Sequence, residues 1–285
     1  MNLNKIAKNI RNILENKKKE LQLSFIEKNH VYFMKDKDGQ LRTDFPSVSK
    51  LLEHFYEPFP AHEVAFKKAN GDQAEMQILL DQWSAIGTYA TNIGSRVHYI
   101  LEKNLIQQYG NYKQVRKPLF EMDIEQEIKS DSMIKAGDNF LVLMKERGAV
   151  LLDTEVVLGD PELGYTGQPD KVWLIQNREK TDYGLIVTDW KTNKPKNFKI
   201  NQWTKPMKAP FAKQPDNKLS HYYLQLSFYA KLLLKMLEDT KYENLKLLGC
   251  IVVLVKDNSD FEEFRVPKEI ITKVINMDMD IYLKK

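Results

Sequence analysis

The fold of this chain is decided by residues 167–191, which begin with Gly-Gln-Pro-Asp-Lys and end with Asp-Trp-Lys. Two apolar, β-favouring runs lie inside this stretch, and the polar segment between them ends in glycine. The runs are 172–175 and 185–187. The pattern predicts two antiparallel strands joined by a turn. If the hairpin is symmetric about residues 179 and 180, Asp170 lies opposite Asp189, and directly paired residues are about 5 Å apart.

Side chains alternate along a strand, so Asp189 and Lys191 are expected on one face and Trp190 on the other. The first face would present the carboxylates of Asp170 and Asp189 beside an ammonium group. Hard cations such as Mg²⁺ bind carboxylate oxygens, and a divalent ion acidifies water and stabilises charge at phosphorus. A lysine beside it can orient the water or offset negative charge. The hairpin therefore indicates phosphodiester cleavage, although a surface hairpin with scattered charges fits the same residues.

Five motifs, which follow one another along the chain in the family's order, resemble the PD-(D/E)xK nuclease superfamily and in particular its RecB-like branch. Gly-x-x-Asp followed by Asp-x-Lys is the superfamily pattern, and Asp-Trp-Lys-Thr at 189–192 is similar to the Asp-Tyr-Lys-Thr of the branch. Residues 94–98, Gly-Ser-Arg-Val-His, resemble its upstream Gly-x-x-x-His motif. Residues 225–229, Gln-Leu-Ser-Phe-Tyr, match its downstream Gln-x-x-x-Tyr motif. Glu155, in the apolar run 150–158, stands where the branch carries a glutamate on the preceding strand.

The resemblance covers residues 45–255, and it implies roles for individual residues. Residues 46–52, with the helix of His98, are also similar to the mitochondrial genome maintenance exonuclease subgroup and its phage and bacterial relatives. The implied catalytic residues are Glu155, Asp170, Asp189 and Lys191. The implied metal ligands are His98, Asp170, Asp189 and the backbone carbonyl of Trp190. The expected ion is Mg²⁺, and an imidazole among oxygen ligands makes Mn²⁺ an alternative.

The outer motifs also have plainer readings. Apolar residues recur at helical spacing over 86–105, with His98 beside the stripe and Gly94 one turn earlier. A glycine inside a helix costs about 1 kcal/mol against alanine, so a close approach is expected at Gly94. A lone helical histidine is more often packed or solvated than a ligand, and a strand-edge glutamate is more often solvated than catalytic. The family order of the motifs favours a ligand role for His98. For Glu155 it leaves a catalytic role and a solvated position equally favoured.

Two segments are expected to contact DNA. Gln225 and Tyr229 share a helix face, and the resemblance implies that they help to hold Lys191 or the scissile phosphate; a stray amide on a buried helix is the alternative. Residues 193–218 interleave lysines with aromatics, which suits a single strand whose bases stack and whose phosphates pair; an ordinary surface excursion is the alternative. The residues expected to bind DNA are Arg96, Lys194, Trp203, Phe211, Gln225 and Tyr229.

Composition sets the outer limits. The chain has 285 residues, 42% hydrophobic and 11% aromatic, which is typical of a globular protein. The net charge of +4 permits nucleic-acid binding without arguing for it. A single cysteine excludes disulfides within the chain and the four-cysteine iron–sulfur site of some relatives of the branch, and it suggests a reducing compartment. No apolar run reaches the roughly 18 residues of a membrane span, so no membrane partner is expected.

The order of patterns predicts an α/β fold: a mixed central β-sheet flanked by helices, like a restriction-endonuclease core, with a helical N-terminal half. Residues 1–45 are expected to form a basic helix and a β-hairpin, 46–148 a helical wall that carries the histidine motif, and 149–285 the nuclease core, with 46–285 as one compact unit. The predicted strands are 150–158, 164–175, 185–191, 247–255 and 261–266. The predicted helices include 124–147, 219–237 and 268–281. The basic helix at the N-terminus is Lys/Asn-rich and is expected to be solvated or to contact DNA.

The sequence therefore predicts a metal-dependent DNA exonuclease that prefers single-stranded or free-ended DNA and works in recombination, repair or genome processing. Alternatives are a nuclease subunit beside a helicase, an endonuclease, or a non-catalytic DNA-binding protein. The chain has no phosphate-binding loop, so a helicase motor would be a separate protein. The intact Asp170, Asp189 and Lys191 argue against the non-catalytic alternative. The expected location is the cytoplasm of a bacterial or phage-infected cell. A mitochondrial location is the less favoured alternative, because the N-terminus lacks the composition of a transit peptide.

Overall fold

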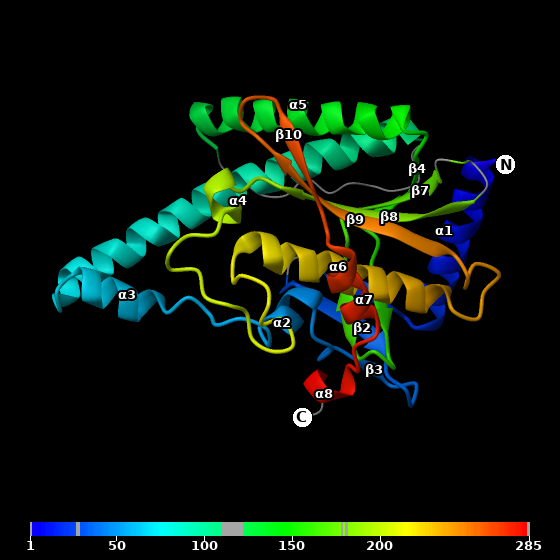
Figure 1. Ribbon diagram of the computed structural model, residues 1–285, viewed down its shortest axis with the longest axis horizontal. Coiled ribbons are helices and arrows are strands. Elements are labelled where there is room, and N and C mark those ends of the chain that lie inside the picture. Colours follow the sequence, from blue (N-terminus) through cyan, green and yellow to red (C-terminus); the bar gives the residue numbers. More distant parts are fainter. Residues whose placement is uncertain (1, 27–28, 110–121, 178, 180–181, 284–285) are drawn as a thin grey trace.

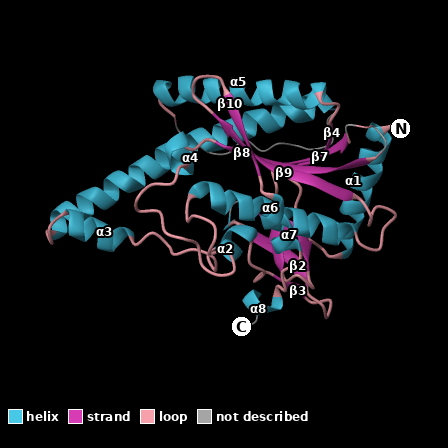
Figure 2. Ribbon diagram, in the orientation of Figure 1, coloured by secondary structure: helices cyan, strands magenta, loops and turns pink. Residues whose placement is uncertain are grey.

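A mixed five-stranded sheet forms the centre of the molecule, as predicted (Figures 1 and 2). The computed structural model describes residues 2–26, 29–109, 122–177, 179 and 182–283. The strand order is β10-β9-β8-β7-β4, and only the β8–β9 pair is parallel. The strands are β4 (Val150–Thr154), β7 (Lys171–Gln176), β8 (Tyr183–Lys191), β9 (Lys246–Val255) and β10 (Phe261–Arg265).

The predicted hairpin is confirmed in position and register. β7 and β8 pair antiparallel, and the last pair at the open end is Lys171 opposite Thr188. Continued by one residue, this register sets Asp170 opposite Asp189. The polar connection includes residues 178 and 180–181, which lie outside the described part of the chain. The strand pattern in the sequence was therefore sufficient to predict that the two acidic residues lie at one end of the sheet.

Two of the predicted strands are each divided in two. The predicted strand 150–158 is β4 followed by β5 (Leu158–Asp160), and 164–175 is β6 (Tyr165–Gly167) followed by β7. β5 and β6 pair with each other in a separate sheet. The first break comes at Glu155, whose φ of +46° is incompatible with an extended strand. The second comes before Pro169, which has no N–H to donate to a ladder.

Helices cover both faces of the sheet (Figure 2). α4 (Gln73–Tyr109) and α5 (Ile124–Glu146) pack together on one face, where they bury Trp173 and Trp190. α1 (Leu3–Glu20) and α6 (Lys218–Leu237) cover the other. Full burial of one large apolar side chain stabilises a fold by about 1.5–3 kcal/mol, so these two layers of core hold the sheet in place.

The N-terminal helix is less solvated than predicted. Ala7, Ile10 and Leu14 of α1 are buried in the same core as α6 and β7, because the apolar residues recur at helical spacing. Only the opposite face, which carries Lys5 and Lys8, is exposed. Beyond α1, the predicted hairpin is a three-stranded antiparallel sheet of β1 (Ser24–Ile26), β2 (Val31–Lys35) and β3 (Leu41–Arg42).

The remaining helices follow the sequence closely. α2 (Val48–Leu52), α3 (Ala61–Lys68) and α4 are separated near Pro58, Pro60 and Gly71, residue types that interrupt a helix. α3 and the start of α4 project from the body as an arm (Figure 1). The predicted helix 268–281 is instead α7 (Lys268–Ile275) and α8 (Asp280–Leu283). α7 ends where Lys231 donates to the carbonyls of Val274 and Met277.

No helix in the described part of the chain combines the length and apolar character that crossing a membrane requires.

Candidate metal centre

The predicted motifs meet where β4 and β8 end and β7 begins. The backbone carbonyl of Asp170 accepts hydrogen bonds from the N–H of Glu155 at 2.9 Å and from Oγ1 of Thr154 at 3.0 Å. These two bonds join the end of β4 to the start of β7. They also hold Glu155 in its left-handed conformation, which turns its side chain out of the strand pattern. The strained backbone at Glu155 therefore belongs to the site.

The carboxylate of Asp170 is held by the neighbouring strand and lies beside α4. Its Oδ2 accepts a hydrogen bond from the backbone N–H of Trp190 at 2.7 Å and lies 3.4 Å from Nδ1 of His98. The approach of α4 explains the helical glycine, because a Cβ at Gly94 would come within 3.3 Å of Oγ1 of Thr192. The predicted close approach at Gly94 is confirmed.

His98, Glu155 and Asp170 form the candidate metal centre. Within the described residues, one ligand atom from each lies within 4.8 Å of the other two. Oxygen and nitrogen ligands bind divalent ions at about 2.0–2.6 Å, so atoms this close can share one ion. Two carboxylates with one imidazole suit Mg²⁺ or Mn²⁺. The donor set of these residues therefore fits a divalent cation, and Glu155, for which the sequence left two readings, is one of the three.

The metal-ligand role of Asp189 stays a prediction. Its carboxylate is 4% exposed and forms an ion pair with Nζ of Lys191, and it does not belong to the three-residue group. The two side chains meet because they lie two positions apart on one strand and so on one face. Trp190 touches Asp170 through its N–H; the role of its carbonyl stays a prediction.

Lys191 is fixed by an aromatic ring as well as by Asp189. Its Nζ lies 4.3 Å from the centre of the Tyr222 ring, and the Tyr222 hydroxyl donates to Oδ1 of Asn193 at 2.8 Å. An ammonium group over an aromatic face is stabilised electrostatically. Sequence reasoning missed Tyr222, although it lies one helical turn before Gln225 and so on a neighbouring part of α6.

The carboxylates of the site repel one another electrostatically. Burial raises the pKa of Glu155 well above its ordinary value, and the negative charge of Asp170 raises it further. Burial and Asp170 also raise the pKa of Asp189, against the pull of Lys191. Burial disfavours the charge of Asp170, but His98 and Lys171 outweigh that cost and hold its pKa below the ordinary value. Crowded carboxylates of this kind are what a bound cation stabilises.

Gln225 and Tyr229 share a face of α6, as predicted. Nε2 of Gln225 donates to the Tyr229 hydroxyl at 3.2 Å, and Tyr229 is buried. The ring of Tyr229 packs against Gly167, where a Cβ would lie 2.6 Å from Cε1 of the ring and 2.9 Å from Cγ2 of Val48. Gly167 of the Gly-x-x-Asp motif therefore leaves room for Tyr229 of the Gln-x-x-x-Tyr motif.

Gly167→Ala is expected to lower the free energy of unfolding by about 1–3 kcal/mol, because overpacking forces neighbours to move. Gly87→Ala is the control: it lies in the exposed part of α4, and among the described residues nothing comes within 4 Å of an added Cβ. That change should stabilise the protein by about 0.5–1 kcal/mol. Urea unfolding measures both, and equal effects at the two glycines would contradict the packing of Tyr229 on Gly167.

Phe211 is a correction among the predicted DNA-binding residues, and Arg96 has partners within the protein. Arg96 donates to Oγ of Ser130 at 2.6 Å and pairs with Asp131 at 2.7 Å, so it ties α4 to α5. Phe211 is 3% exposed and its ring meets that of Phe55 edge-on at 5.1 Å. Phe55 is distant from Phe211 in the sequence, so nothing in the sequence indicated that Phe211 would be buried.

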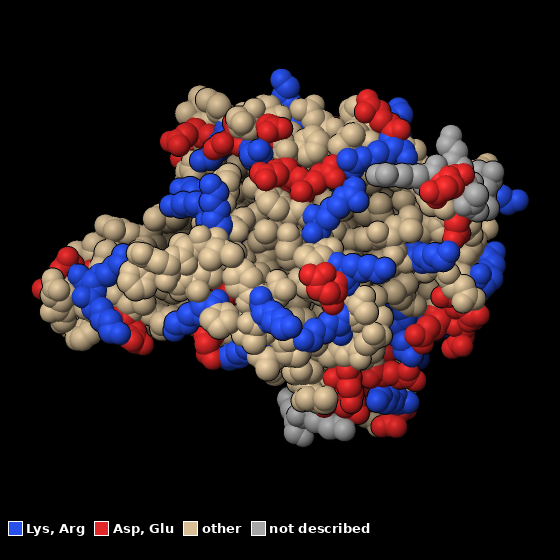
Figure 3. Space-filling model, viewed as in Figure 1, with Lys and Arg blue, Asp and Glu red and all other residues tan. Residues whose placement is uncertain are grey.

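The other two predicted DNA-binding residues of the segment 193–218 are exposed. Trp203 is 80% exposed, and Lys194 is exposed just after the end of β8. The short 3-10 helix η2 (Pro195–Phe198) follows, with Phe198 buried. The face seen in Figure 3 shows basic side chains interspersed with acidic ones rather than one continuous basic field. Attraction of a nucleic acid would therefore depend on local groups such as these.

Replacing Trp203 by alanine is expected to weaken binding of single-stranded DNA about tenfold without changing stability, since stacking contributes about 1–3 kcal/mol per base. Phe211→Ala should do the reverse and lower the free energy of unfolding by about 3–5 kcal/mol, because it empties a core position. Fluorescence anisotropy with a labelled oligonucleotide and urea unfolding separate the two effects. Unchanged DNA affinity in Trp203→Ala would remove this residue from the interface.

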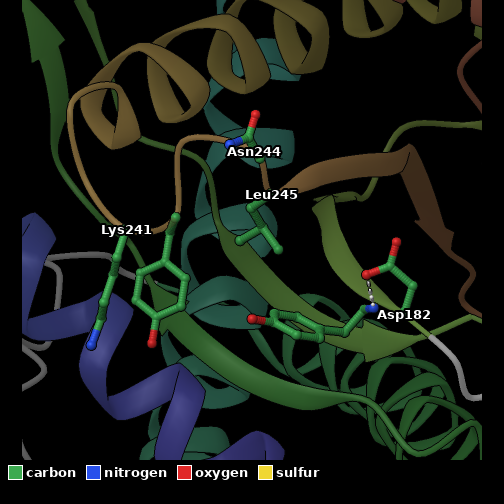
Figure 4. A pocket seen from close by; sticks show the side chains of 6 residues that line it. Asp182, Lys241, Asn244 and Leu245 are labelled. Carbon is green, nitrogen blue, oxygen red and sulfur yellow. Dashed lines mark hydrogen bonds between the residues drawn. The ribbon is translucent and has the colours of Figure 1, made fainter.

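A surface pocket lies far from the candidate metal centre, at the opposite end of the β7–β8 hairpin. It is lined by Asp182, Tyr183, Lys241, Tyr242, Asn244 and Leu245 (Figure 4). The carboxylate of Asp182 accepts a hydrogen bond from the Tyr183 backbone N–H at 2.8 Å and pairs with Lys246. These contacts stabilise the start of β8 and bring no second carboxylate or imidazole into the pocket lining.

No protein-family model matches the chain, and no curated protein matches it in sequence. The functional assignment therefore depends on the geometry of the candidate metal centre.

Proposed function

We propose that the chain is a metal-dependent deoxyribonuclease of the RecB-like branch of the PD-(D/E)xK superfamily, acting as an exonuclease on single-stranded or free-ended DNA. The observation that carries the proposal is the meeting of His98, Glu155 and Asp170 beside the ion-paired Lys191 at one end of the sheet. Carboxylates, an imidazole and a lysine in one place are suited to hydrolysis of a phosphodiester.

Each residue has a distinct task in this proposal. His98, Glu155 and Asp170 would hold Mg²⁺ or Mn²⁺. When bound, such an ion supplies the positive charge that acidifies water and stabilises the charge developing at phosphorus. The Trp190 N–H fixes the orientation of the Asp170 carboxylate. Lys191, held by Asp189 and Tyr222, offers a positive charge to the phosphate or orients the attacking water.

The proposed preference for single strands comes from the loop that follows Lys191. Its exposed Trp203 and its lysines suit stacked bases and phosphates. The arm of α3 and α4 extends beyond the body and would form the opposite wall (Figure 1). The proposed setting is recombination, repair or genome processing in the cytoplasm of a bacterial or phage-infected cell, alone or with a separate helicase or recombination partner.

The test is cleavage of linear single-stranded DNA labelled at the 5′ or the 3′ end, with Mg²⁺ and with excess EDTA. The proposal expects metal-dependent release of nucleotides from one end and poor cutting of a blunt duplex. A closed circular single strand should resist. Equal cutting of circle and linear strand would replace the exonuclease with an endonuclease at the same site. DNA binding without any cleavage would leave a non-catalytic DNA-binding protein.

A further inference from the structure

The edge strand β4 carries an irregularity just before it reaches the candidate metal centre. Leu151 and Asp153 pair with consecutive residues of β7, so Leu152 is an extra residue in β4. A β-bulge of this kind re-aims the side chains that follow it, because side chains alternate along a strand with a period of two. The faces taken by the last residues of β4 are therefore set by the bulge.

The residues after the bulge lead directly to Glu155. Asp153 is paired with Val172 and so lies on the face of the sheet that α1 and α6 cover. Thr154 returns to the opposite face, and its hydroxyl donates to the carbonyl of Asp170. Glu155 follows in the left-handed conformation, which a residue other than glycine keeps only where its neighbours hold it. Its place in the metal centre therefore depends on how β4 arrives.

Arg11 of α1 holds the backbone of the bulge. Its Nε donates to the carbonyl of Leu152 at 2.9 Å, and its Nη2 donates to the carbonyl of Leu151 at 3.4 Å. The guanidinium group is planar and carries its donors in a fixed geometry, so contacts to two successive carbonyls restrain the orientation of both. α1 packs on β4 and is anchored in the core by its apolar face, so a fixed element presents this group.

We propose that Arg11 is a positioning residue for the metal centre: by clamping the bulge of β4, it sets the backbone of Glu155. The hydrogen bond from the Glu155 N–H to the Asp170 carbonyl, 2.9 Å long, forms only when β4 ends in this register. The inference rests on the proposed function in one respect, that Glu155 is taken as a ligand of the ion. The backbone geometry itself is measured without metal and without DNA.

The first measurement is amide hydrogen exchange in the metal-free full chain, followed by NMR. Arg11→Met keeps an unbranched side chain and removes the donors, so the Glu155 amide should exchange about tenfold faster or more, as expected of a local opening. The amides that pair β8 with β9 should exchange as in the wild type. Lys17→Met is the control: Lys17 lies on the same helix and donates to the carbonyl of Glu238, at the end of α6, so its loss should leave the Glu155 amide unchanged.

The second measurement is calorimetric titration with Mn²⁺. Arg11→Met should weaken Mn²⁺ binding about tenfold, a typical effect of removing a group that orients a metal ligand. The same change made in a Glu155→Gln protein should weaken binding no further, because Arg11 acts through Glu155. A merely structural role would reduce the affinity by the same factor in both backgrounds.

Unchanged exchange of the Glu155 amide in a folded Arg11→Met protein would overturn the proposal, and so would equal losses of Mn²⁺ affinity in the two backgrounds. If Arg11→Met does not fold, Arg11→Lys decides: it keeps the charge but not the paired donors, and should show smaller losses of the same kind. Faster exchange at Glu155 in a protein that binds no Mn²⁺ would sink the metal centre and leave Arg11 as the residue that sets this backbone. Mn²⁺ binding without DNA cleavage would remove the nuclease function alone.

Discussion

Asp170→Asn is expected to abolish divalent-ion binding and to lower DNA cleavage by about a thousandfold or more. The carboxylate is one of the three groups of the metal centre, and metal ions contribute several kcal/mol to transition-state stabilisation, with each 1.36 kcal/mol worth tenfold in rate. Asparagine has the same shape and can still accept the hydrogen bond from Trp190, so the fold should survive. Single-turnover cleavage and Mn²⁺ titration measure the two losses.

The matched control is Asp182→Asn, at the opposite end of the same hairpin. Asp182 is partly exposed and pairs with Lys246 at the surface, so the same chemical change there should leave both cleavage and Mn²⁺ binding intact. Normal Mn²⁺ affinity in a folded Asp170→Asn protein would show that the ion binds elsewhere.

Lys191→Met should lower cleavage by about a hundredfold to a thousandfold while Mn²⁺ binding persists. Removal of one preorganised group that stabilises transition-state charge typically costs this much. Lys191 is not one of the three grouped ligands; its charge is held by Asp189 and the ring of Tyr222. The expected signature is therefore a loss of turnover in a protein that still takes up metal.

Lys246→Met supplies the comparison, since this lysine is exposed at the far end of the sheet and should be dispensable. Robust cleavage by folded Lys191→Met would rule out a catalytic role for Lys191. Loss of Mn²⁺ binding in that variant would instead mean that Lys191 shapes the metal centre through Asp189.

The register of the β7–β8 hairpin was predictable because it depends on local information. Alternating apolar residues and a polar turn between them fix which residues face each other, and so bring Asp170 and Asp189 to one end of the sheet. The closeness of α4 was predictable for a similar reason: a glycine in a helix is costly, and Gly94 lies against Thr192.

The points that the sequence left open or predicted wrongly depend on contacts between residues that are distant in the chain. Glu155 reaches the metal centre only because its backbone leaves the strand conformation and binds the Asp170 carbonyl. Phe211 is buried because it meets Phe55, which lies far away in the sequence.

Crystals soaked in Mn²⁺ test the central claim most directly, through anomalous difference density near the manganese absorption edge. The account predicts one peak per chain, within coordination distance of His98, Glu155 and Asp170, with Nζ of Lys191 nearby but not bound to the ion. An ion bound elsewhere, with the His98 side chain turned away from Asp170, would contradict the metal centre and the function proposed from it.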